Sequence, residues 1–132
     1  MAGINNLAQL LKKMKPSLQK GEYVFCTLSE KEFIVKKIKK YVMKFEEKEG
    51  VTLILEKNIA VKNKLAFSGS WSWIILTVHS DLAAVGFLAA ITKELAASGI
   101  SVNAVSAYYH DHLFVPIEKA GVAMQVLRKF SL

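Results

Sequence analysis

The sequence predicts an α+β fold of two βαββα units, each with an antiparallel sheet and with helices packed on one face. In the second half, segments rich in aromatic and β-branched residues alternate with segments of helical periodicity in the order βαββα. The turn between its last two strands is too short for a parallel crossover, so these strands run antiparallel. The first half carries a similar set of strands and helices, which suggests a tandem repeat of about 66 residues.

The expected domains are therefore an N-terminal half, residues 1–66, which is divergent and starts with an extra helix, and a C-terminal half, residues 67–132. In the first half the expected elements are a helix over 4–14 that Pro16 stops, a strand over 22–28, a hairpin turn at 47–50, a strand over 51–55 and a helix over 58–65. The structure of residues 29–44 stays open: their apolar residues fit a helix loosely, and 41–46 also fits a strand.

The second half is more regular. Its expected elements are a strand over 71–79, a helix between the N-caps Ser80 and Asp81 and the stop at Gly99, a strand over 101–109, a turn at His110 and Asp111, a strand over 112–115 and a helix after Pro116. Both faces of the strand over 71–79 are apolar, because Ile74 and Leu76 point one way while Trp73 and Ile75 point the other. The second face needs cover, which favours a homodimer or a higher homo-oligomer.

Composition excludes several classes of protein. The chain of 132 residues has one cysteine, Cys26, so it forms no internal disulfide, and we expect a reducing, cytoplasmic location. The longest apolar stretch, 82–91, is too short to cross a bilayer of about 30 Å, and no export signal precedes it, so no membrane partner is expected.

The net charge of +7 lies in the first half, where 14 lysines face 7 glutamates, while the charges of residues 67–132 cancel. Arg128 is the only arginine, and the lysines at 36–40 lack the interleaved aromatic residues of a stacking platform. We interpret the lysines as a solvated face and expect no nucleic-acid partner. An RNA-binding ferredoxin-like domain is the less favoured alternative.

Residues 81–102 carry a pattern of Asp81, an early helical Gly86, spaced leucines and Gly99-Ile100, and this pattern resembles the ACT domain. The segments 21–25, 49–54, 76–80 and 108–115 extend the resemblance over nearly the whole chain, to a family of small bacterial tandem-ACT proteins. The resemblance implies two ferredoxin-like units side by side, a regulatory role and an amino acid as ligand, which we expect to bind between the units.

The loop His79-Ser80-Asp81 is the expected ligand site, because a strand end followed by a helix N-terminus offers free N–H groups to an anion. An amino acid's carboxylate would bind there, Asp81 would hold the ammonium, and Gly86 would allow close approach. The alternative is that Ser80 or Asp81 only caps the helix. The expected ligand-binding residues are His79, Ser80, Asp81, Leu82, Val85, Gly86, Asn103 and His110.

The segment His110-Asp111-His112 could suggest a metal site with His79, but a turn there breaks the strand alternation and no spaced Cys or Glu completes it. We expect a polar turn and no metal. The glutamates around the turn at 47–50 are interpreted as solvated, and the sequence contains no phosphate loop, nucleophile elbow or dinucleotide fingerprint. We expect no catalytic residues and no cofactor, hence a sensor that binds an amino acid; the alternative is a ligand-free interaction or scaffold module.

Overall fold

The computed structural model describes Gly3 and residues 6–132, which form two compact units. Residues 21–71 form one, here called the central unit, while residues 1–20 and 72–132 form the other, here called the discontinuous unit. This division differs from the expected halves at residue 66. Its physical reason is that Leu10 and Met14 are fully buried in the same core as the C-terminal helices.

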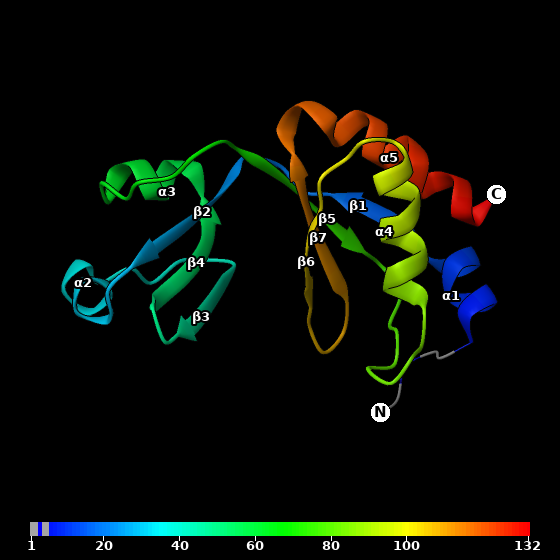
Figure 1. The fold of residues 1–132 in the computed structure, drawn as a ribbon, viewed down its shortest axis with the longest axis horizontal. Coiled ribbons are helices and arrows are strands. Elements are labelled where there is room, and N and C mark those ends of the chain that lie inside the picture. The colour runs from blue at the N-terminus through cyan, green and yellow to red at the C-terminus, as the bar shows by residue number, and fades with distance from the viewer. Residues whose placement is uncertain (1–2, 4–5) are drawn as a thin grey trace. The chain divides into compact units, whose positions relative to one another are not determined.

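The discontinuous unit combines both ends of the chain (Figure 1). Its elements are α1 (Leu7–Lys13), β1 (Pro16–Leu18), β5 (Trp71–Leu76, whose first residue belongs to the central unit), α4 (Phe87–Ala97), β6 (Asn103–Ser106), β7 (Asp111–Pro116), a 3-10 turn (Ile117–Lys119), α5 (Ala120–Arg128) and a last 3-10 turn (Lys129–Ser131). The strand order is β1-β5-β7-β6, with β1 antiparallel to β5 and β6 antiparallel to β7.

Strand alternation sets the core of this unit. Ile74 and Leu76 of β5 and Leu113 and Val115 of β7 are buried against side chains of α1, α4 and α5, as the sequence predicts for the first pair. On the other face of the sheet, the half-buried Trp73 stacks on Phe114, with ring centroids 6.1 Å apart. The helices therefore pack on one face, in agreement with the predicted fold class.

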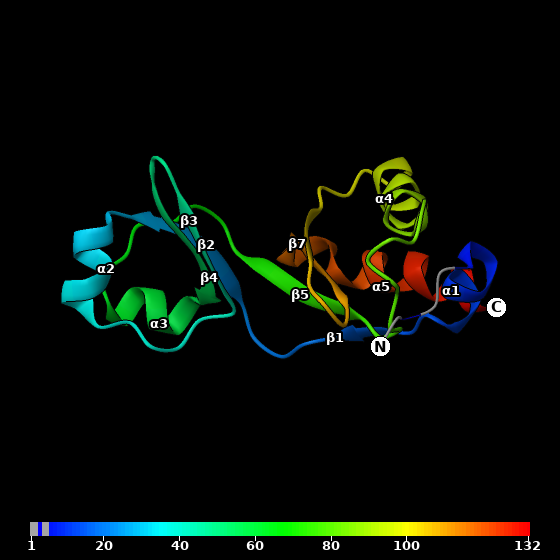
Figure 2. The same ribbon diagram turned by 90° about the horizontal axis from the view of Figure 1, so that it is seen from below.

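The central unit contains β2 (Tyr23–Leu28), α2 (Glu30–Lys36), β3 (Met43–Glu47), β4 (Gly50–Glu56) and α3 (Lys57–Lys62). Its strands are antiparallel in the order β3-β4-β2, and α3 lies beside β2 and β4 (Figure 2). A capping box of Ser29 and Glu32 begins α2, and Lys37 in a left-handed conformation ends it. Residues 29–44 thus supply both the helix and the start of the strand that the sequence left open.

Three sequence expectations are corrected at element boundaries. Pro16 begins the short strand β1, which pairs with β5. Helix α4 begins at Phe87 and not at Leu82, because Gly86 has φ +87°, a left-handed conformation that a helix cannot pass through. The hairpin turn lies at 107–110, where Ala107 N–H donates to the His110 carbonyl at 3.0 Å, so Asp111 is the first residue of β7. The expected helical residue Ile4 lies outside the described residues.

Within the described ranges, every helix is shorter or more polar than a membrane-spanning helix must be.

Candidate functional site

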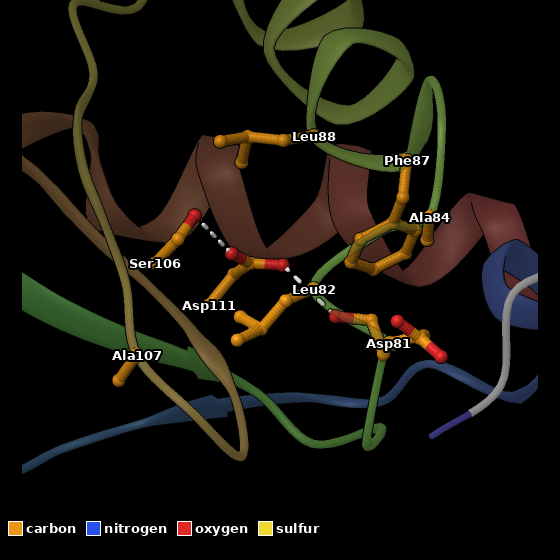
Figure 3. Close-up of a pocket in the computed structure, with 9 residues that line it drawn as sticks. Asp81, Leu82, Ala84, Phe87, Leu88, Ser106, Ala107 and Asp111 are labelled. Carbon is orange, nitrogen blue, oxygen red and sulfur yellow. Dashed lines mark hydrogen bonds between the residues drawn. The ribbon is translucent and has the colours of Figure 1, made fainter. Parts of the chain in front are cut away.

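A cavity of about 90 Å³ lies in the discontinuous unit between the segment that leads into α4 and the β6–β7 hairpin (Figure 3). Four polar residues and five apolar ones line it: Ser80, Asp81, Ser106 and Asp111, together with Leu82, Ala84, Phe87, Leu88 and Ala107. A cavity needs about 10–15 Å³ of such space to hold one water molecule, so this volume is large enough for several waters or a small ligand. All nine lining residues belong to this one unit.

Asp111 is the most buried charged side chain of the cavity, with 7% of its surface exposed. It shares a face of β7 with Leu113 and Val115, the face that the helices cover. The Ser106 hydroxyl donates to its Oδ1 at 2.5 Å, as Figure 3 shows, because Ser106 is the cross-strand partner of Asp111. The Ser80 hydroxyl donates to Oδ2 at 3.4 Å. Both of these donors are neutral hydroxyls, so the carboxylate keeps its attraction for a cation.

Asp81 performs a different task from the predicted helix cap. Its Oδ1 accepts the N–H of Ala83 at 2.8 Å, which closes a short Asx turn ahead of α4, which begins only at Phe87. The side chain is half-buried and lines the cavity, with its carboxylate beside Ala84 and Phe87 in Figure 3. Asp81 therefore stabilises a turn and does not cap helix α4, in contrast to the capping alternative that the sequence offered.

The first turn of α4 forms another wall, through Phe87 and Leu88. The N-cap is Gly86, which has no side chain to accept a hydrogen bond from the first N–H groups of this 11-residue helix. Those N–H groups and the helix dipole give this end of the cavity a partial positive charge. The cavity thus has a carboxylate from β7 on one side and an uncapped helix N-terminus on the other.

The structure brings three of the predicted site residues to the cavity, namely Ser80, Asp81 and Leu82. The other five predicted residues are not among its lining. His79 contacts exposed rings instead, with centroids 5.4 Å from Tyr109 and 6.2 Å from Tyr108. Val85 is 84% exposed, Gly86 is the N-cap of α4, Asn103 pairs with Phe114, and the His110 ring lies 6.4 Å from that of His112.

Sequence reasoning missed the lining residues Ala84, Phe87, Leu88, Ser106, Ala107 and, above all, Asp111. The available signal was the alternation of β7. Counting back in steps of two from the apolar Val115 and Leu113 reaches Asp111. The placement of Asp111 in a turn interrupted that count.

The histidines do not form the metal site considered from the sequence. His112 Nδ1 accepts a hydrogen bond from Trp73 Nε1, and the His79 ring lies against Tyr108 and Tyr109. Across the part of the chain that the structure describes, no three His, Cys, Asp or Glu side chains are grouped as a metal site requires.

Two models of the ACT domain family match the sequence, one over residues 2–71 and the other over residues 70–129. The chain belongs to the ACT domain family. The two matched segments follow the halves of the sequence, whereas the compact units differ from these halves by residues 1–20, which pack with 72–132. ACT domains are regulatory domains that bind ligands, so the expected tandem ACT organisation is confirmed.

Similar solved structures agree with this assignment. A protein of unknown function from Vibrio cholerae, described as a possible transport protein, is 43% identical, with 96% of each chain covered and a TM-score of 0.83. A protein from Agrobacterium tumefaciens is 18% identical over 89% of each chain, with a TM-score of 0.68. The regulatory subunit of aspartate kinase from Thermus flavus shares the fold at 8% identity, covering 98% of this chain and 99% of that one, with a TM-score of 0.68. A search of curated proteins found no match.

Proposed function

We propose that this tandem ACT protein is a regulatory sensor without catalytic activity, and that it binds a small amino acid in the cavity at Asp111. The observation that carries the proposal is the buried carboxylate of Asp111, which accepts hydrogen bonds from the hydroxyls of Ser80 and Ser106. A buried charge is costly unless it is paired, and an ammonium group supplies both the opposite charge and several N–H donors.

The charges around the cavity favour a zwitterion. Asp81 and Asp111 are the charged lining residues, so a simple anion would meet two negative charges. The uncapped N-terminus of α4, at Phe87 and Leu88, offers the one partial positive charge that we identify there. The ammonium of an amino acid would bind Asp111, and its carboxylate would bind the N–H groups of α4. In this proposal the ammonium is bound by Asp111, and not by Asp81 as the sequence predicted.

The experiment is a thermal-shift screen of the whole chain against each of the twenty amino acids at millimolar concentration, followed by calorimetry on any that raise the melting temperature. A ligand present at 100 times its Kd stabilises the folded state by about 2.7 kcal/mol, which such a screen detects. Acetate and methylammonium serve as controls that carry one charge each. If no amino acid shifts the melting temperature, the proposed ligand class is wrong.

Exposed side chains near the cavity support a second role in assembly. Tyr109 is 62% exposed, and Tyr108, Leu82 and Val85 are also exposed. Tyrosine and apolar side chains of this kind are typical of protein–protein contacts. We propose that these exposed side chains, with Tyr108 and Tyr109 in contact with each other, form the patch through which the protein makes a homo-oligomer, most simply a dimer. Light scattering at micromolar to millimolar concentration tests it, and a Tyr109→Ser variant should lower the mass if the patch is the interface.

A further inference from the structure

We propose that the N-terminal segment, meaning here Gly3 and residues 6–15, positions the ligand loop. Gly3 is the principal positioning residue of this segment. The loop in question is 77–86, which leads from β5 into α4 and carries Ser80, Asp81 and Leu82 into the cavity. The inference rests on the proposed function only for its effect on binding, because the contacts themselves involve no ligand.

The N-terminal segment reaches the loop at three points. At its start, the N–H and the hydroxyl of Thr77 both donate to the Lys15 carbonyl, at 2.9 Å and 2.5 Å. In the middle, Gly3 lies against the backbone of His79 and Asp81. At its end, a Cβ on Gly86 would lie 3.6 Å from Leu7 Cδ2, so helix α1 reaches the residue that caps α4.

The approach at Gly3 is too close for any side chain. A Cβ added there would overlap the His79 carbonyl oxygen and would lie 2.8 Å from the His79 carbonyl carbon and 2.9 Å from the Asp81 nitrogen. Real Cβ atoms do not come so close, and the neighbouring atoms belong to backbone, which cannot move aside as a flexible side chain can.

Other contacts also hold the loop: Val78 is buried in the core, the His79 ring lies against Tyr109, and the Ser80 hydroxyl donates to Asp111. Leu82, Ala83 and Val85 are exposed, so these side chains contribute little packing. Inside the loop, the hydrogen bond from the Ala83 N–H to Asp81 Oδ1, at 2.8 Å, closes a short turn. Because Ser80 lies between His79 and Asp81, moving their backbone would carry Ser80 away from Asp111, and the wall of the cavity with it.

The test compares Gly3→Ala with Gly121→Ala in the full-length protein. Gly121 is the control, because it lies in helix α5 and an added Cβ there meets nothing within 4 Å. Amide NMR spectra and hydrogen exchange report the loop without any ligand. We expect Gly3→Ala to shift and deprotect the amides of 77–86 while those of β4 stay at their wild-type positions, and Gly121→Ala to leave the loop unchanged.

The binding arm uses the amino acid that gives the largest thermal shift with the wild-type protein. Gly3→Ala should weaken its affinity roughly tenfold or more, because the loop must then be reordered on binding, while Gly121→Ala should retain it. Should Gly3→Ala fail to fold, Leu7→Ala removes the contact with Gly86 without adding an atom, and the loop amides nearest Gly86 should shift.

Two results would overturn the inference: loop amides that match the wild type in Gly3→Ala, or shifted loop amides with unchanged affinity. A wild-type protein that binds no amino acid would instead refute the proposed function. The amide spectra would still show whether Gly3 positions the loop, so the two failures are distinguishable.

Discussion

Trp73 on β5 donates its indole Nε1–H to Nδ1 of His112 on β7, with the two nitrogens 3.0 Å apart. Because Nδ1 accepts this hydrogen bond, the ring proton of His112 lies on Nε2 and the imidazole is neutral. Burial lowers the pKa of His112 below its ordinary value, and the nearby His110 lowers it further, against a smaller opposing effect of Asp111. The strand pair therefore contains a histidine that resists protonation.

We expect acidification to destabilise the protein through this histidine. The unfolded chain binds the proton of His112 near pH 6.5, above the lowered pKa of the folded state. The unfolded state then binds more protons, so the free energy of unfolding is highest above about pH 6.5 and falls as the pH drops toward the folded pKa. Urea unfolding between pH 5 and pH 8 measures this. His112→Gln keeps an acceptor for Trp73 without titrating, and an unchanged pH profile in this variant would contradict the assignment.

Asp111→Asn should weaken amino acid binding more than Asp81→Asn does. A charged hydrogen bond contributes about 1.5–3 kcal/mol, so losing it at Asp111 should raise the Kd roughly 10- to 150-fold. Asp81 already accepts the Ala83 N–H and is less buried, which makes it the weaker anchor. Calorimetry measures both, with Glu118→Gln on the exposed 3-10 turn as a control for charge removal. Equal losses of affinity in the two variants would show that Asp81 also binds the ammonium, as the sequence suggested.

Gly86→Ala should destabilise the discontinuous unit by about 1–2 kcal/mol, because an L-residue is strained in a left-handed conformation. Gly86 has φ +87°, and an added Cβ would otherwise find ordinary contact distance to Leu7. Thermal melting measures the loss. Gly121→Ala, on α5, should instead gain about 0.5–1 kcal/mol from helix propensity. A Gly86→Ala variant as stable as the wild type would show that the loop adopts another conformation.

Cys26 should react slowly with thiol reagents in the native protein. It is 4% exposed on β2, and burial raises the pKa of its thiol, so little of the reactive thiolate is present at pH 8. Labelling should then follow local opening of the central unit and should accelerate with sub-denaturing urea. Timed reaction with an aromatic disulfide reagent tests this, with fully unfolded protein as the reference. Rapid, complete labelling without urea would contradict the burial of Cys26.

The sequence by itself determined the parts of the fold that depend on near neighbours. The alternation of Ile74 and Leu76 against Trp73 predicted which face of β5 is buried, and the turn at 47–50 predicted the β3–β4 hairpin. Of the residues predicted for the ligand site, Ser80, Asp81 and Leu82 lie in the loop between β5 and α4 and line the cavity. These inferences use periodicity and capping, which act over a few residues.

Only the tertiary structure decided what joins distant segments. Pro16–Leu18 pairs with Ile74–Leu76, so the first strand belongs to the unit of the C-terminal helices. The Ser80 hydroxyl bonds Asp111 because β7 packs beside the loop that follows β5. Gly3, near the N-terminus, lies against the backbone of His79, which is far away in the sequence. No local pattern encodes such contacts. The N-terminal segment lies where it does because Leu10 and Met14 are buried in a core that they share with the C-terminal helices.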